Sequence, residues 1–310
     1  MNDLFQTFVA GLRLGCIYGL VALGYTMVYG VLRFINFAHG DIVMVGAWLC
    51  FIVARAMHWT GFTAHPPLYA AAFVLLISMT ACALLGWLTE RLAYRPLRRA
   101  PRLNVLIAAI GVSLFIENAG QLRFLFGTEP QAMPSLLPRA QTALITLLGV
   151  RITVLDVVIG LLAVGLMIAL DILVFRTRLG LAMRAVAFDD AAAALTGVPV
   201  NRVVGMTFII GSALAAAGGF IFATEYHNLQ QPAEMSWILL GLKAFVAAVV
   251  GGIGNIRGAM VGGLLLALLE QFGGRYVSND LRDVYVFAIL ILVLLVKPGG
   301  IMGAQVTEKV

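Results

Sequence analysis

The chain has 310 residues, 61% of them hydrophobic and only 12% charged, with a mean hydropathy of +0.98 and a formal net charge of +6. A soluble domain is about 45–50% apolar and about 25% charged, so this composition excludes a soluble fold around one ordinary core. It predicts an all-α, polytopic transmembrane helix bundle in a single domain, residues 1–310, with lipid as its solvent. The positive charge is almost entirely arginine between apolar stretches, which is typical of the cytoplasmic ends of spans and not of a nucleic-acid-binding surface.

A membrane-spanning helix needs about 20 mostly apolar residues. By this measure we expect nine spans, within a range of eight to ten. They are predicted at residues 4–31, 35–53, 68–88, 103–126, 154–175, 204–224, 237–252, 258–272 and 284–296. The last three are short, which predicts that some of them are tilted, broken or re-entrant.

Two polar loops carry most of the arginines and set the expected orientation. Loop 89–102 contains Arg91, Arg95, Arg98, Arg99 and Arg102, and loop 176–202 contains Arg176, Arg178, Arg184 and Arg202. Because arginine concentrates in short cytoplasmic loops, both loops are predicted to be cytoplasmic, and the two spans between them are consistent with this. Counting outward places the N-terminus outside and the C-terminal tail in the cytoplasm.

The first polar cluster, from Asn36 through His39 to Asp41, lies where the first span gives way to the second. One interpretation is local, with Asn36 or Asp41 capping the second helix and Gly40 easing the turn. The other places Asn36, His39 and Asp41 along a solute path, because polar groups at membrane depth tend to face cavities. The position at a helix start favours the local interpretation.

Glu117 and Asn118 form a second polar pair, inside the fourth predicted span. An acid in this setting is costly, so it is expected to face the bundle interior or water. Hydrogen bonding between helices and a role in the translocation pathway are equally compatible with the sequence.

Loop 176–202 is the longest polar interruption in the C-terminal two-thirds of the chain. A short helix is predicted over residues 181–188 and another over 191–196, with Asp190 as the N-cap of the second and Gly197 just past its end. Helices shorter than about 12–15 residues are marginal in water unless something packs on them. The pair therefore either packs on the protein's own inner face or is held by a partner.

Glycines repeat every four residues at two places, Gly11, Gly15 and Gly19, and Gly254, Gly258 and Gly262. Small residues at this interval let two helices approach closely in lipid. The run Gly251, Gly252, Gly254 and Asn255 is different, because three glycines within four residues weaken a helix. It predicts a broken helix near a pathway, since non-helical backbone at membrane depth lies in protein or lines a water-filled cavity.

Motifs of catalysis are missing from the sequence. It contains no G-x-x-x-x-G-K-[ST] phosphate-binding loop, no H-E-x-x-H and no paired Cys/His spacing for a metal. We therefore expect no catalytic residue, no metal site and no cofactor, and a transport subunit that does not itself bind nucleotide.

Three stretches resemble the branched-chain amino acid ABC transporter permeases of the LivH type. They are GCIYGLVALGYTMVYGVLRFINFAHGDIVMVGAW, RTRLGLAMRAVAFDDAAAALTGV and VVGGIGNIRGAMVGGLLLALLE, and the resemblance covers nearly the whole chain. Within the second stretch, DDAAAALTGVP is similar to the cytoplasmic loop through which ABC importer permeases dock into their ATPases, with Asp at the acidic position.

The resemblance implies a pore subunit of the bacterial inner membrane that works with two ABC ATPase subunits, a second homologous permease and an external solute-binding protein. It implies coupling through Arg184, Asp189, Asp190, Ala193 and Gly197. Related permeases carry urea or short amides, so these remain alternatives to branched-chain amino acids. A third alternative is an ion-coupled secondary transporter that uses Glu117 or Asp41.

Overall fold

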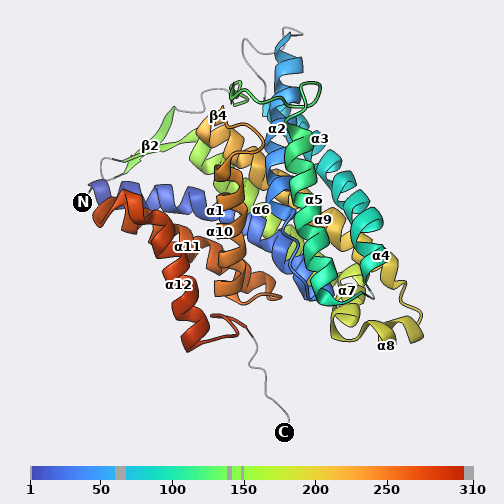
Figure 1. Ribbon diagram of the computed structural model, residues 1–310. Coiled ribbons are helices and arrows are strands. Elements are labelled where there is room, and N and C mark those ends of the chain that lie inside the picture. Colours follow the sequence, from blue (N-terminus) through green and yellow to red (C-terminus); the bar gives the residue numbers. More distant parts are fainter. Residues whose placement is uncertain (1, 60–67, 99, 138–141, 148–149, 304–310) are drawn as a thin grey trace.

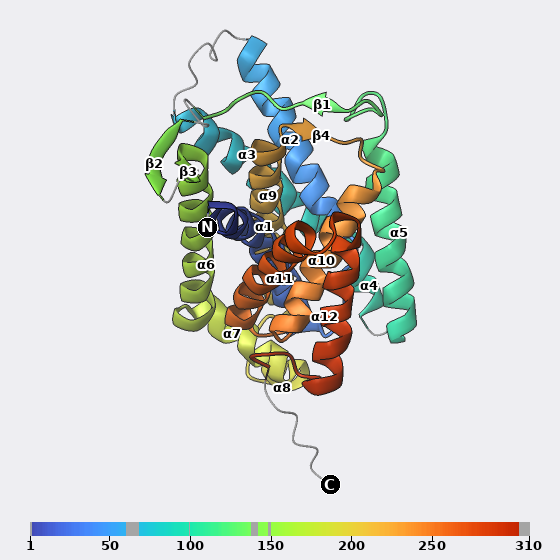
Figure 2. The ribbon, with the colours of Figure 1, turned by 90° about the vertical axis from the view of Figure 1, so that its left-hand side faces the viewer.

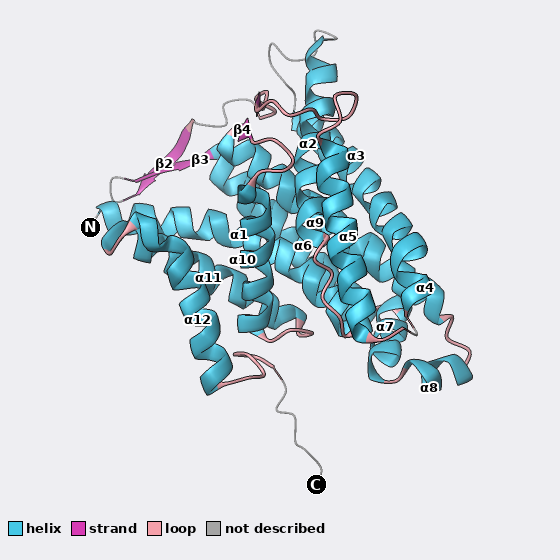
Figure 3. Ribbon diagram, in the orientation of Figure 1, coloured by secondary structure: helices cyan, strands magenta, loops and turns pink. Residues whose placement is uncertain are grey.

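Helices dominate the computed structural model, which describes residues 2–59, 68–98, 100–137, 142–147 and 150–303 (Figures 1 and 3). The first half contains α1 (Asn2–Leu32), α2 (His39–Trp59), α3 (Leu68–Thr89), the π-helical turn η1 (Glu90–Tyr94), α4 (Arg95–Leu97), α5 (Arg102–Gly120) and α6 (Val154–Arg176). The second half contains α7 (Arg178–Phe188), α8 (Asp190–Leu195), α9 (Val200–Tyr226), α10 (Met235–Gly251), α11 (Ile256–Tyr276), the 3₁₀ turn η2 (Asn279–Leu281) and α12 (Arg282–Val296).

A helix occupies each of the nine predicted spans, and the predicted all-α bundle is confirmed. Among the described residues, seven helices are long and apolar enough to cross a membrane. The other two, α10 and α12, have 17 and 15 residues, so nine full-length spans are not reached. The eighth predicted span is longer than expected, because α11 begins directly after its N-cap, Asn255, and extends over 21 residues.

Several boundaries differ from the prediction, and three of them bear on the site. The second helix begins at His39 and not at residue 35, and the fourth ends at Gly120 and not at 126. The third does not stop before the arginines but continues through η1 and α4 to Leu97. This extension is possible because Glu90 is buried on it and pairs with arginines of the same segment. Arg99 lies outside the described residues.

The core forms where α1 packs between α9 and α11, and Figure 2 shows the start of α1 almost end-on beside α6 and α11. The predicted glycine face of α1 is confirmed. Modelling a Cβ on Gly11 or Gly15 would bring it within 3.0 Å of α11 side-chain atoms, and a Cβ on Gly263 would lie 2.6 Å from the Gly19 nitrogen. Gly258 and Gly262 likewise face α10, whereas Gly254 lies in the preceding turn.

Two small antiparallel sheets, which the sequence did not predict, lie in the loops. One pairs β1 (Gln131–Ala132) with β4 (Asn228–Leu229), and the other joins β2 (Ala143–Leu147) to β3 (Val150–Thr153). The first sheet lies at one end of the bundle and α4, α7 and α8 lie at the other (Figure 1). The two arginine-rich loops are therefore at the same end, as their predicted orientation requires.

Candidate functional site

The segment between α1 and α2, residues 33–38, is irregular backbone inside the bundle. It begins at Arg33, whose φ of 55° ends α1 in a left-handed conformation. Asn36 is 2% exposed; its carbonyl accepts from the His39 N–H at 3.1 Å, and its Oδ1 accepts from the Tyr94 hydroxyl at 2.6 Å. Asn36 is thus not a side-chain cap. It joins the start of α2 to the π-helical turn.

The first turn of α2 lies deep in the bundle. A Cβ added at Gly40 would be 3.1 Å from the Gly241 Cα, near the middle of α10. The Asp41 carboxylate accepts a hydrogen bond from Ser113, near the middle of α5. A helix that begins among the middles of its neighbours is a discontinuity of the kind that builds solute sites in transporters. The sequence predicted a break at residues 251–255 and missed this one.

His39 lies next to this discontinuity and is 1% exposed. Its ring meets that of Tyr25 edge-on, with 4.6 Å between centroids. Two nitrogens at this place, Asn36 Nδ2 and His39 Nε2, are buried without a hydrogen-bond partner within the described residues. A buried donor or acceptor left unpaired is costly, so the start of α2 holds polar groups that the protein itself does not satisfy.

A cavity of about 250 Å³ adjoins Asp41, between α2, α5 and α10. Asp41, Ser113 and the hydroxyl of Tyr25 are its polar side-chain groups, and its apolar lining includes Phe37, Ile238 and Phe245. Asp41 itself is 4% exposed. The cavity thus combines a buried carboxylate with an apolar wall.

The structure separates the two members of the second polar pair. Glu117 is 8% exposed, lies one turn after Ser113 on α5 and is within electrostatic reach of Asp41. Asn118 is on the exposed side of the helix, where its side-chain amide donates to the Leu114 carbonyl at 2.7 Å. Asp41, Ser113 and Glu117 therefore gather, and Asn118 faces away from them.

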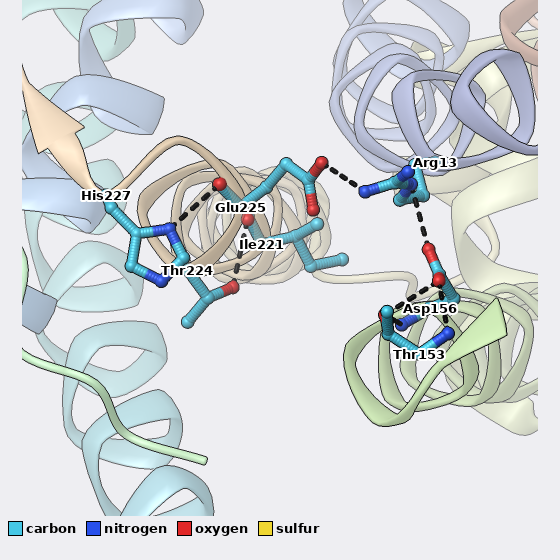
Figure 4. Close-up of polar contacts among 7 residues, drawn as sticks. All are labelled: Arg13, Thr153, Asp156, Ile221, Thr224, Glu225 and His227. Carbon is cyan, nitrogen blue, oxygen red and sulfur yellow. Dashed lines mark hydrogen bonds and ion pairs between the residues drawn. The ribbon is translucent and has the colours of Figure 1, made fainter. Parts of the chain in front are cut away.

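Three other groups of acids, two of them buried and one half-buried, are paired with cations. Glu90 contacts Arg95 at 2.9 Å and also pairs with Arg98. Glu270 lies 2.7 Å from Lys243 Nζ. Arg13 of α1 bridges α6 and α9, lying 2.8 Å from Asp156 and 2.6 Å from Glu225; these three residues are shown in Figure 4. Sequence inspection missed these pairs, although Lys243 and Glu270 each interrupt an apolar stretch and were detectable for that reason.

The loop between α6 and α9 forms two short helices, close to the predicted bounds. The N-cap of α8 is Asp189, whose carboxylate accepts from the Ala192 N–H at 2.9 Å, and not Asp190, which is the first helical residue. The cap lies one residue earlier than predicted because Asp189 has the extended backbone (φ −156°, ψ 110°) of an N-cap, which lets its side chain accept from a free N–H group of the first turn. Gly197 follows α8 with a φ of 85°, as predicted for the position past a helix end.

α7 and α8 differ in how they pack. α7 buries Gly180, Met183 and Val186 against the bundle, and Arg184 donates to the Val174 carbonyl at the end of α6. Arg184 is therefore a local brace. α8 buries only Ala193, and the side chains on either side of it, Phe188 and Leu195, are 88% and 90% exposed.

Arg33 links the end of α7 to residues 33–38, and Arg98 links the turn after α4 to α9. Arg33 Nη2 donates to the Ala187 carbonyl, at the end of α7, at 3.2 Å. Arg98 donates to the Asn201 side chain, in the first turn of α9, at 2.9 Å. Burial lowers the pKa of Arg98 below its ordinary value and Glu90 opposes the shift, so the guanidinium stays charged. The same region contains a cavity of about 430 Å³, whose lining includes Arg33, Arg98 and Asp189.

The glycine run forms the turn that joins α10 to α11. α10 ends at Gly251, Gly252 and Gly254 take φ values of 109° and 92°, and the Asn255 side chain caps α11 by accepting from the Gly258 N–H at 3.1 Å. The predicted break in the helix is therefore confirmed. None of its residues lines the Asp41 cavity, and the turn packs on residues 299–303.

Comparison with known proteins places these features in a family. Residues 7–294 match the family described as "Branched-chain amino acid transport system / permease component". The chain is 41% identical to the high-affinity branched-chain amino acid transport system permease protein BraD of Pseudomonas aeruginosa, over 98% of this chain and 97% of BraD. It has the same identity and coverage with LivH of Escherichia coli, a protein described in the same words.

A more distant relative is a probable branched-chain amino acid transport permease protein LivH of Methanocaldococcus jannaschii. It is 24% identical over 92% of this chain and 88% of its own length. No solved structure shows a significant match. The family match over nearly the full length and the 41% identity agree with the helical bundle and its buried polar centre. The chain belongs to the family of branched-chain amino acid transport system permease components.

Proposed function

We propose that this chain is the membrane-spanning permease subunit of a bacterial ABC importer that carries branched-chain amino acids. Two relatives with that stated substrate match it at 41% identity over 98% of its length. The absence of a phosphate-binding loop from the sequence fits a subunit whose energy comes from partner ATPases. This function has more support than transport of urea or amides or ion-coupled transport, because the three relatives reported above are described as branched-chain amino acid permeases.

The proposed assembly lies in the inner membrane and contains two ATPases, a second permease and an external solute-binding protein. Loops 89–102 and 176–202 face the cytoplasm in this arrangement. Support comes from their position at one end of the bundle, with the β1–β4 sheet at the other (Figure 1). The solute-binding protein would then meet the β1–β4 end.

The observation that carries the coupling proposal is the exposure of α8. Helices as short as α8, with 6 residues, are not stable alone in water. Two large apolar side chains, Leu195 on α8 and Phe188 at the end of α7, are almost fully exposed. An ATPase that packs on Phe188 and Leu195 would cover both. Asp189 and Gly197 fix the ends of the helix, and Asp190 and Ala193 lie between them.

Movement of α8 would reach the solute path through Arg33. Its hydrogen bond to Ala187 connects the end of α7 to residues 33–38, which lead into Asn36, His39 and Asp41. We place Glu117 on the same path because it lies near Asp41. Asn118 and the turn at Gly251, Gly252, Gly254 and Asn255 are left off it, because neither faces the Asp41 cavity.

Ala193→Pro tests the coupling assignment in the reconstituted transporter. The Ala193 N–H donates to the Asp189 carbonyl at 3.0 Å, and proline in a helix interior removes such a bond at a cost of about 3 kcal/mol. The expected result is loss of both transport and stimulated ATP hydrolysis, with normal insertion in the membrane. Normal uptake would contradict coupling through α8.

A milder pair of variants separates docking from folding. Leu195→Ala removes exposed apolar surface from α8, and Leu161→Ala does the same on α6, where Leu161 is 70% exposed. Only the first is expected to weaken co-purification of the ATPases. If the two variants co-purified equally reduced amounts of the ATPase subunits, the effect would not be specific to α8.

Uptake of labelled leucine, urea and short amides by a strain lacking its own permeases tests the substrate. Leucine uptake that requires the ATPases supports the proposal. Uptake of amides alone, or of leucine without any ATPase, would overturn it.

A further inference from the structure

We propose that the Asp41 cavity is a solute subsite for an aliphatic α-amino acid, with the ammonium group held by Asp41 and the side chain against the apolar wall. Glu117, one turn after Ser113 on α5, would add negative charge beside the site. The proposal rests on the proposed function and deepens it, because it assigns each part of the solute to a named part of the cavity.

The charge of the site is the first argument. Asp41 and Glu117 are 4% and 8% exposed, and among the described residues neither has an Arg, Lys or His nitrogen within 4.0 Å. Burying a carboxylate without a partner is costly. Glu90 and Glu270, which are buried to the same degree, do have cationic partners in the protein. The Asp41 site therefore lacks a cation that the other buried acids have, and an ammonium ion supplies it.

The shape and lining of the cavity are the second argument. Its volume of about 250 Å³ is below the range of about 300–1,000 Å³ that is usual for drug-sized ligands, so it suits a small solute. Ile238, Leu242 and Phe245 approach from α10, and Phe37 closes the side next to residues 33–38. These side chains offer no hydrogen bonds and suit a branched aliphatic group.

Ser113 orients the carboxylate. Its hydroxyl donates to Asp41 Oδ2, which leaves Oδ1 for the solute. The backbone on the opposite side is fixed, because Gly40 and Gly241 are in direct contact and a Cβ on Gly241 would lie 2.8 Å from the Gly40 Cα. The carboxylate and the apolar wall are thus held at a constant separation.

The test is uptake by the complete transporter in proteoliposomes, with binding protein outside and ATP inside. Asp41→Asn keeps the size of the side chain and its contact with Ser113 but removes the charge. We expect leucine uptake to fall at least about tenfold, since the loss of one partner of a buried charge pair commonly costs more than this. ATP hydrolysis stimulated by the binding protein is expected to persist, because α8 is unchanged.

Several controls keep the outcome decisive. Asp171→Asn removes an acid that pairs with Arg257 on the surface and should leave uptake unchanged. Ser113→Ala keeps the charge and should give a partial loss, so the proposal stays testable if Asp41→Asn does not fold. Wild-type rates of leucine uptake in Asp41→Asn or in Asp41→Asn combined with Glu117→Gln would overturn the subsite. Failure of the wild-type transporter to import any branched-chain amino acid would instead overturn the proposed function.

The apolar wall has its own test. Leu242→Phe reduces the cavity and should lower uptake of leucine more than uptake of valine or alanine, whereas Leu161→Phe, on the outside of α6, should change none of them. An unchanged ratio of leucine to alanine uptake in Leu242→Phe would show that the side chain of the solute does not lie here.

Discussion

Two regions of the bundle contain buried carboxylates that differ in their interaction partners. Between α1, α10, α11 and α12, Lys243 Nζ lies 2.7 Å from both Glu270 and Asp283, and the Tyr18 hydroxyl donates to Glu270 at 2.7 Å. Between α2, α5 and α10, Asp41 has a serine for a partner and another acid nearby, and a cavity opens beside it. The buried acid of the first region has a cationic partner, and that of the second has none in the described part of the chain.

The difference separates structure from function in a membrane protein where any buried charge suggests a role. In the Lys243 region both oxygens of the buried Glu270 have partners, Lys243 and the Tyr18 hydroxyl, and Lys243 also pairs with the partly exposed Asp283. The cluster therefore fastens four helices to one another. In the Asp41 region some buried polar groups have no partner within the described residues, among them Asn36 Nδ2 and His39 Nε2. These groups remain able to bind a solute. Breaking the first should change stability, and neutralising the second should change transport.

The largest effect on stability is expected from Lys243→Met. This variant leaves Glu270 buried without its cation, which typically costs about 3–5 kcal/mol. Thermal unfolding of the detergent-purified protein should show a clearly lower midpoint. Arg257→Ala, which breaks an exposed pair with Asp171, is the matched control and should leave the midpoint within the scatter of the measurement. Equal midpoints for the two variants would show that the Lys243 cluster does not brace the bundle.

A smaller effect is expected from Glu90→Gln. Glu90 is fully buried, but its partners Arg95 and Arg98 are partly exposed and can recover hydration when the charge is lost. Hydrogen bonds to charged groups contribute about 1.5–3 kcal/mol, which is below the cost expected at Lys243. The lowered midpoint should be accompanied by faster proteolysis after Arg98, which follows α4. A variant as stable as the wild type would mean that the π-helical turn does not depend on this pair.

The smallest effect on stability is expected from Asp41→Asn. Because the carboxylate has no cation to lose and the neutral contact with Ser113 remains, the variant should lose at most about 1 kcal/mol of stability. Removal of an unpaired buried charge acts in the stabilising direction. The same protein samples used for uptake provide the measurement. If Asp41→Asn were destabilised as strongly as Lys243→Met, the carboxylate would be structural and the contrast between the regions would disappear.

Much of this molecule was accessible from sequence patterns with a local cause. The glycines spaced by four on α1 predicted close helix packing because a helix places such residues on one face. Asp190 and Gly197 predicted the bounds of α8 to within one residue, because caps act on the few N–H and C=O groups next to them. The continuation of the third helix through η1 and α4 was not predicted, because the arginines after residue 88 indicated a loop and their partner Glu90 was not considered.

The sequence by itself determined the solvent of this protein, its helical class, the family to which it belongs and the short helices between α6 and α9. Each of these follows from composition or from residues close together in the chain. Only the tertiary structure decided which buried acids are satisfied. Lys243 and Glu270 are 27 residues apart, Tyr18 and Glu270 are 252 apart, and Asp41 meets Ser113 across 72 residues. An acid in an apolar stretch has a known cost, but the groups that offset this cost come from other helices, and their identity depends on packing.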